Sequence, residues 1–180
     1  MTDRPEASDE AGGHGNPRIA RPASIEDLKT VLRALAAENV EYVLIGGYAL
    51  YALGYQRGTI DIDILLRPTL EQGERVRRAL LVLPDKVATE LDPAWFLERE
   101  TIRVADAFVV DLMFNACGET LETLESHTVT IDFDGVPVRT LGLEGLLKTK
   151  QSQREKDRLD RMLLERALQE LRSGRPPGES

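Results

Sequence analysis

Apolar residues recur every three or four positions in several segments of the chain, which is the period of a helix with one buried face. The first such segment predicts a helix over 25–38, where Ser24 and Asp27 have the spacing of a capping box. The same signal places Thr69 and Gln72 at the start of another helix. The further predicted helices are 48–54, 69–83, a short helix around Trp95, 142–151, and 153–172, where Ser152 and Glu155 suggest a capping box.

Other segments have the two-residue alternation or the short apolar runs of strands. Residues 42–45 form a buried-strand pattern that ends at a pair of glycines, and isoleucines alternate with polar residues over 59–66. The flanking apolar residues favour a central position for the second of these strands. The remaining predicted strands are 101–105, 108–114 and a hairpin over 128–139 with its turn at Asp134-Gly135.

Together these elements predict one α/β (α+β) domain, with a mixed central sheet of about four to six strands flanked by helices and with helices at its C-terminal end. Residues 1–22 are rich in Gly, Pro and acidic residues and lack apolar periodicity, so we expect a disordered N-terminal arm. Residues 173–180 have the same character. The predicted folded domain is therefore 23–172.

The charge of the chain argues against a protein that coats nucleic acid. The 180 residues have a formal net charge of −8. Residues 141–172 nevertheless carry eight Lys or Arg against six Asp or Glu, so this segment is the most positive part of the predicted domain. A phosphate-rich ligand would be drawn to it.

Few residues are available for Cys or His chemistry. Cys117 is the single cysteine, which excludes an internal disulfide, and we expect it to be a small buried apolar residue. The chain has only two histidines, so a Ser-His-Asp or Cys-His mechanism has little to draw on. No long apolar run predicts a membrane span, and acidic residues stand where a signal peptide is apolar. We therefore expect a cytoplasmic protein without a membrane partner.

The strand at 59–66 carries the most informative polar residues. Thr59, Asp61 and Asp63 share one face in a strict period of two, with the carboxylates about 7 Å apart along an ideal strand. Two such charges call for a cation, and oxygen ligands suit Mg²⁺ or Mn²⁺ better than zinc. A solvated edge strand is the alternative interpretation.

Asp111 is a third acidic residue of interest because its neighbours in 108–114 are apolar. A lone buried charge costs several kcal/mol unless it is paired or bound to a metal. If 108–114 lies beside 59–66, three carboxylates converge on one cation. An ion pair with a nearby Lys or Arg remains the alternative.

The pair Gly46-Gly47 ends a strand and opens a helix, and exposed backbone N–H groups at such a place can bind phosphate. Arg57, shortly before the acidic strand, could add a phosphate contact or serve as a structural arginine.

The string IGGYALYALGYQRGTIDIDILL, residues 45–66, resembles the glycine-pair and paired-aspartate signature of the DNA polymerase β-like nucleotidyltransferases, with Asp111 in the place of their third carboxylate. The second glycine, the Arg57-Gly58-Thr59 approach and the tail EGLLKTKQSQREKDRLD look most like the AbiEii and MenT toxin group of type IV toxin–antitoxin systems. In those relatives a helical lysine and a basic-Asp pair complete the site, and Lys150 and Lys156-Asp157 match them here.

The resemblance implies the nucleotidyltransferase fold and transfer of a nucleoside monophosphate from an NTP, such as ATP, to an acceptor hydroxyl, with release of pyrophosphate. It implies two Mg²⁺ ions, or Mn²⁺ in their place, bound by Asp61, Asp63 and Asp111. Lys150 joins these aspartates as a catalytic residue. The residues implied to bind or orient the nucleotide are Gly46, Gly47, Arg57, Thr59, Lys150 and Asp157.

Three functions remain open at this stage. A toxin-like enzyme would modify RNA, with tRNA the first choice, and would pair with a cognate antitoxin. A related enzyme would adenylylate a partner protein. A third reading is a non-catalytic module that binds nucleotide for regulation.

Overall fold

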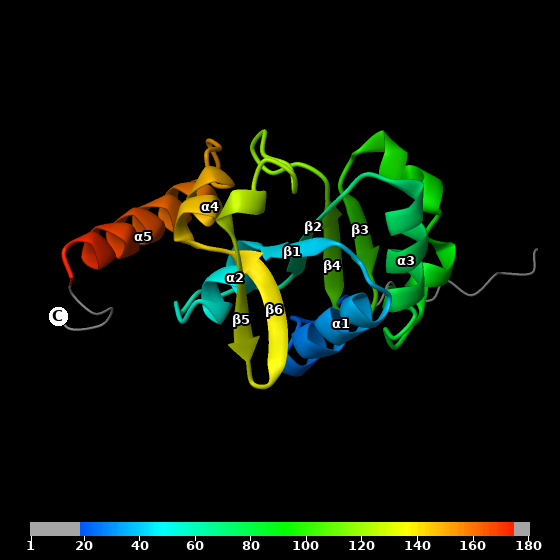
Figure 1. The fold of residues 1–180 in the computed structure, drawn as a ribbon. Helices are drawn as coiled ribbons and strands as arrows, with labels where there is room; N and C mark the ends of the chain where they lie inside the picture. The colour runs from blue at the N-terminus through cyan, green and yellow to red at the C-terminus, as the bar shows by residue number, and fades with distance from the viewer. Residues whose placement is uncertain (1–18, 175–180) are drawn as a thin grey trace, which may run out of the picture.

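The computed structural model describes residues 19–174, which form a six-stranded mixed sheet with helices packed around it (Figure 1). The strand order is β3-β4-β2-β1-β6-β5. The predicted α/β architecture and strand number are confirmed. The strands are β1 (Tyr42–Ile45), β2 (Ile62–Leu66), β3 (Ile102–Ala105), β4 (Val109–Met113), β5 (Thr128–Phe133) and β6 (Val136–Leu141).

The helices follow the predicted pattern closely. Ser24 and Asp27 form the expected capping box, and the Thr69 side chain accepts the N–H of Gln72. The α-helices are α1 (Ile25–Ala37), α2 (Gly46–Ala52), α3 (Leu70–Leu80), α4 (Leu143–Lys148) and α5 (Glu155–Arg172). Short 3-10 helices are η1 (Val87–Glu90), η2 (Pro93–Glu98) and η3 (Glu125–His127).

The capping box expected at the last helix is wrong. Arg154 is the N-cap of α5, without a side-chain cap. The Ser152 hydroxyl accepts the backbone N–H of Arg154 and donates to the Asp157 carboxylate. The helix therefore starts two residues later than predicted, and Ser152 orders the turn that precedes it.

The predicted disordered arm falls largely outside the described residues, as does the tail beyond residue 174. At the described end of the arm, the Arg21 side chain pairs with Asp27 at 2.5 Å and its backbone N–H donates to Ala107. The N–H of Ala23 donates to the carbonyl of Ile60.

β2 is a central strand, which the sequence predicted. It pairs antiparallel with β1 and parallel with β4, and Ile62 and Ile64 are fully buried. The strand begins at Ile62, however, so its predicted span was three residues too long. The preceding residues form a bend in which the Thr59 hydroxyl donates to the carbonyl of Asp61, at 3.3 Å. Asp61 therefore does not share a regular strand face with Asp63.

The hairpin β5–β6 turns at Asp134 and Gly135, where φ is +50° and +80°. Two positive φ angles in succession match the type I′ turn that suits the twist of a two-residue hairpin. The predicted Asp-Gly turn is thus confirmed.

The helices form two groups around the sheet. α1 packs on α3, while α4 packs on α5. In Figure 1 the ends of the molecule are marked by α3 on one side and by α5 on the other. Among residues 19–174, none of the helices combines the length and apolarity required to cross a membrane.

Candidate active site

The site is organised around the contact between Gly46 and Asp63. The register pairs Ile45 of β1 with Asp63 of β2, so the turn after β1 lies directly against the carboxylate. Gly46 has φ +72°, and a Cβ atom built on it would lie 2.2 Å from Oδ2 of Asp63. Only glycine fits here, both for its backbone angle and for the space left by the carboxylate.

Asp63 and Asp111 lie beside each other. They are register partners on the parallel strands β2 and β4, as expected from the sequence. Burial, followed by the charge of Asp111, raises the pKa of Asp63 to about 6, although Lys156 and Lys150 oppose that rise. Burial also raises the pKa of Asp111, against the effect of Arg103. Nearby positive charge therefore does not fully offset the burial of these two carboxylates.

Asp61 is bound by an arginine that also contacts Asp111. Arg103 lies on β3 opposite Asp111, and its Nη2 donates to Oδ2 of Asp61 at 2.9 Å. Its Nη1 lies 3.3 Å from Oδ2 of Asp111. The guanidinium thus bridges two of the three predicted metal ligands, and the side chain is 57% exposed.

The three aspartates are near one another but do not form a ready-made ligand set. Among residues 19–174, no three His, Cys, Asp or Glu side chains are placed to hold a metal ion together. The donor chemistry still fits a hard cation, because Asp63 and Asp111 are adjacent carboxylates with raised pKa values. For Asp61 to join them, its contact with Arg103 has to open.

Lys150 lies in a network of charges at the start of α5. Its Nζ is 3.0 Å from Oδ2 of Asp160 and 3.5 Å from Oδ1 of Asp157. The other oxygen of Asp160 accepts from Nε of Arg57 at 2.5 Å. Asp160 is almost completely buried, with 1% of its side chain exposed. Burial alone would raise the pKa of Asp160, but hydrogen bonds from Arg57 and Lys150 outweigh that effect and lower it.

The other predicted nucleotide-binding residues lie behind this network. A Cβ atom on Gly47 would stand 2.5 Å from Cβ of Thr59, so the two residues are packed tightly together. The Arg57 guanidinium also donates to the carbonyl of Gly58. Gly47, Arg57 and Thr59 do not line the cleft next to Asp63.

That cleft has a volume of about 360 Å³. The cleft is lined by the glycine turn, the end of β4 and the segment between α4 and α5. Both carboxylates and cations are among its lining residues. Cys117 lies at its edge and is exposed, so the expectation of a buried cysteine is wrong. The lining residues are Ile45, Gly46, Asp63, Thr101, Met113, Asn115, Ala116, Cys117, Thr149, Lys150, Ser152, Arg154, Lys156 and Asp157.

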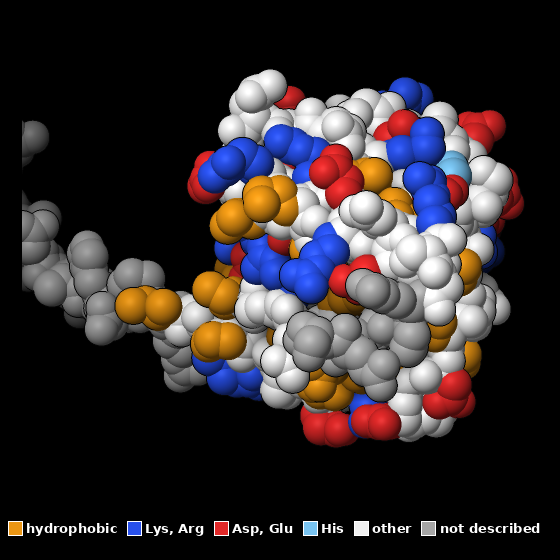
Figure 2. Space-filling model, turned by 90° about the vertical axis from the view of Figure 1, so that its left-hand side faces the viewer, with side chains coloured by type: hydrophobic (Ala, Val, Ile, Leu, Met, Phe, Trp, Pro, Cys, Tyr) orange, Lys and Arg blue, Asp and Glu red, His pale blue; other side chains and the backbone are white. Residues whose placement is uncertain are grey.

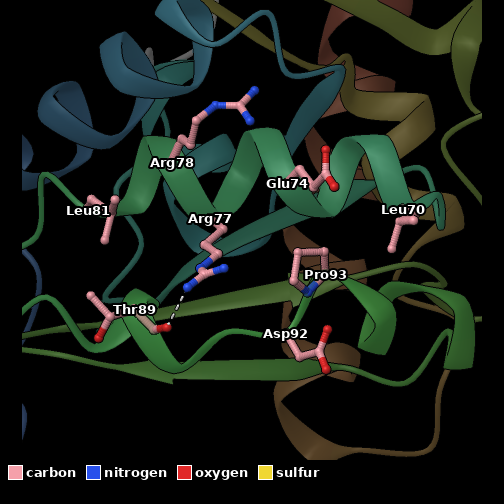
Figure 3. Close-up of a pocket in the computed structure, with 8 residues that line it drawn as sticks. All are labelled: Leu70, Glu74, Arg77, Arg78, Leu81, Thr89, Asp92 and Pro93. Atoms are coloured by element: carbon pink, nitrogen blue, oxygen red, sulfur yellow. Dashed lines mark hydrogen bonds between the residues drawn. The ribbon is translucent and has the colours of Figure 1, made fainter.

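A larger hollow of about 660 Å³ lies between α3 and the 3-10 helices η1 and η2 (Figure 3). Its arginines already have partners: Arg77 donates to the carbonyl of Thr89, which lines the same hollow, and Arg78 donates to Glu38. Its lining contains neither paired carboxylates nor a lysine. Carboxylates and lysines occur together at the smaller cleft instead.

Sequence reasoning missed two residues that order the site. Asp160 follows Asp157 by three positions on a helix, which places both on one face, and this spacing could have identified it. Arg103 alternates with buried residues of β3, but its contact with two aspartates depends on the pairing of β3 with β4. Only the fold reveals that contact.

Comparison with known proteins supports the fold. The sequence matches no protein-family model and no curated protein. The structure is similar to a crystal structure from Thermotoga maritima whose protein is provisionally named a nucleotidyltransferase. The two share 16% sequence identity with a TM-score of 0.51, over 90% of this chain and 100% of the other. The chain thus has a nucleotidyltransferase-like fold.

Proposed function

We propose that the chain is a metal-dependent nucleotidyltransferase that moves a nucleoside monophosphate from an NTP to an acceptor hydroxyl. The observation that carries the proposal is the register of β2 and β4, which sets Asp111 beside Asp63, while Asp63 itself lines the cleft against Gly46. Lys150 reaches the same cleft. The fold of the Thermotoga maritima protein agrees with this proposal.

In the proposed reaction the acceptor oxygen forms a bond to the α-phosphorus, and the bond from that phosphorus to the β-phosphate bridge breaks. Asp63 and Asp111, joined by Asp61 once it leaves Arg103, would hold two Mg²⁺ ions or Mn²⁺. The ions would neutralise the charge that develops on the attacking and leaving oxygens. Asp111 would help to take the acceptor proton, Gly46 would position the phosphates, and Asp157 would orient Lys150.

For the acceptor we propose RNA, with tRNA as the first candidate, in a toxin of the AbiEii and MenT type. The support is the matching tail, whose Lys150 and Asp157 lie 3.5 Å apart in the structure. Such a toxin would be held in check by a cognate antitoxin. Adenylylation of a partner protein is the second candidate, and the two differ only in the acceptor.

The experiment combines the purified protein, Mg²⁺ and each α-labelled NTP in turn with either total tRNA or whole-cell protein. Label on RNA would support the toxin-like function and identify the nucleotide, whereas label on a protein would support adenylylation. The control is Asp63→Ala, which should transfer no label. Full activity in an Asp61→Ala, Asp63→Ala double variant would contradict the catalytic assignment. Magnesium-dependent NTP binding without transfer would favour a regulatory module.

A further inference from the structure

The two cations that the sequence assigned to the triphosphate are already neutralised. Arg57 and Lys150 both bind the buried carboxylate of Asp160, at 2.5 Å and 3.0 Å, and Lys150 also contacts Asp157. Arg57 is further fixed by the carbonyl of Gly58 and does not line the cleft. The positive charges of Arg57 and Lys150 are therefore largely neutralised by carboxylates, and these ion pairs hold α5 against the loop before β2.

Two other cations line the cleft and are free of such partners. Arg154 and Lys156 are exposed, and neither side chain forms an ion pair or hydrogen bond with another residue in the described part of the chain. The opposite holds for the next cation on α5, Arg158, which binds both oxygens of Glu155.

The charge of Lys156 reaches the candidate catalytic carboxylates. It is the largest of the effects that lower the pKa of Asp63, and it also lowers that of Asp111. Lys156 and Asp63 also line the same cleft. Since Gly46 lies against Asp63 and lines the same cleft, the glycine turn and the free positive charge of Arg154 and Lys156 share one cleft.

We propose that Arg154 and Lys156 bind the β- and γ-phosphates of a nucleoside triphosphate in this cleft. Arg57 and Lys150 then have the different task of fixing the segment that carries these two side chains. The assignment rests on the proposed function for the choice of a nucleotide as ligand. It changes which residues recognise the triphosphate: it gives Lys156 a phosphate-binding role, and it adds Arg154, which the sequence motifs do not mark.

The chemistry of the pair suits this ligand. A triphosphate carries several negative charges, and a guanidinium can donate two parallel hydrogen bonds to phosphate oxygens while an ammonium adds a compact charge. Charge-assisted hydrogen bonds of this kind correspond to about a tenfold loss of affinity for each cation removed. AMP lacks the β- and γ-phosphates, so its affinity should depend little on either residue.

The test is calorimetric titration of the full chain with ATP, AMP and inorganic tripolyphosphate, each in the presence of Mg²⁺. Arg154→Ala and Lys156→Ala should each weaken ATP and tripolyphosphate binding about tenfold, and the double variant about 100-fold. The matched control is Arg166→Ala, which removes the same charge from the same helix at a residue paired with Glu170. That variant should bind all three ligands within twofold of the wild type, and circular dichroism should show an unchanged fold in every case.

Several results would overturn the assignment. These are unchanged ATP and tripolyphosphate binding in the double variant, an equal loss for AMP, an equal loss in Arg166→Ala, or no binding of ATP or tripolyphosphate by the wild type. The binding assay needs no turnover, so the two proposals can fail separately. Weakened tripolyphosphate binding without any label transfer would leave the phosphate site standing and remove the proposed function. Label transfer that is unchanged when Arg154 and Lys156 are replaced would support the proposed function and contradict the phosphate site.

Discussion

At the scale of single residues, Gly46 matters through the atom that it lacks. Its φ of +72° favours glycine, and its absent Cβ makes room for the Asp63 carboxylate. Gly54 provides a comparison, because it has φ +92° but open space around it. A comparison of the two glycines therefore separates the effect of a left-handed backbone from the effect of a Cβ atom that contacts the candidate site.

Gly46→Ala and Gly54→Ala should both lose stability, by about 1–2 kcal/mol for the left-handed backbone alone. Gly46→Ala should lose more, because its Cβ has to displace Asp63, and it should also abolish label transfer. Gly54→Ala should remain active. Urea unfolding and the transfer assay measure the two effects, and a fully active Gly46→Ala would show that the position of Asp63 is not critical.

Also at the scale of single residues, Asp63 should make the stability of the folded protein depend on pH. Its pKa is raised from 3.8 to about 6, so the folded protein binds this proton more tightly than the unfolded chain does. The contribution of Asp63 to stability therefore falls as pH rises from about 4 to about 6, and the loss is complete above the folded pKa. A shift of this size corresponds to at most about 3 kcal/mol.

Asp63→Asn should accordingly be more stable than the wild type at pH 7 without divalent cations, by up to about 3 kcal/mol, and should have no advantage at pH 4. The measurement is urea unfolding in EDTA at several pH values between these limits. Glu98→Gln, at an exposed residue, is the control for replacing a carboxylate by an amide. Equal stability of Asp63→Asn and wild type at pH 7 would mean that the charge of Asp63 is better compensated than the structure indicates.

At the scale of elements, the sequence predicted that each strand and helix exists, but it was less accurate about where elements that start with polar residues begin. The alternation at 59–66 identified the central strand, but period two cannot show that the first polar residues leave the ladder. Thr59 and Asp61 instead form a bend that a side-chain hydrogen bond stabilises. Likewise Ser152 caps the turn before α5 rather than the helix itself.

The candidate site was predictable where it depends on motifs and on one strand pairing. Gly46, Asp63 and Asp111 come together as the sequence suggested. Arg103 and Asp160 were not foreseen: the spacing from Asp157 could have placed Asp160 on the same helix face, but the contacts of both residues depend on how the elements pack. Asp160 lies 103 positions from Arg57, and this separation carries no local signal.

Asp160 joins α5 to the candidate site, so its removal should destabilise the folded protein. Asp160→Ala leaves Arg57 and Lys150 without their shared carboxylate, and breaking a buried pair of this kind costs about 3 kcal/mol. The control on the same helix is Glu170→Ala, which breaks a surface pair with Arg166 and should cost less than about 0.5 kcal/mol. Urea unfolding compares the two variants. Similar stabilities would mean that the network does not anchor α5.

At the scale of the whole molecule, the distribution of charge restricts how an RNA acceptor could bind. The net charge is −8, and most cations of the basic segment 141–172 are paired with carboxylates. On the face shown in Figure 2, Lys and Arg side chains form separate groups with acidic and apolar side chains between them. The described residues visible on this face form no continuous basic surface that could follow a phosphate backbone.

An RNA substrate should therefore bind weakly and be modified in passing. In 150 mM NaCl, tRNA should show no retardation in a native gel at protein concentrations up to about 10 µM, because non-specific affinity depends on the number of phosphates neutralised. Replacement of Glu165 and Glu170 by Lys raises the net charge by four and should bring retardation within that range, without changing the cleft. If the wild type instead retards tRNA at nanomolar concentration, recognition rests on specific contacts with the RNA rather than on charge.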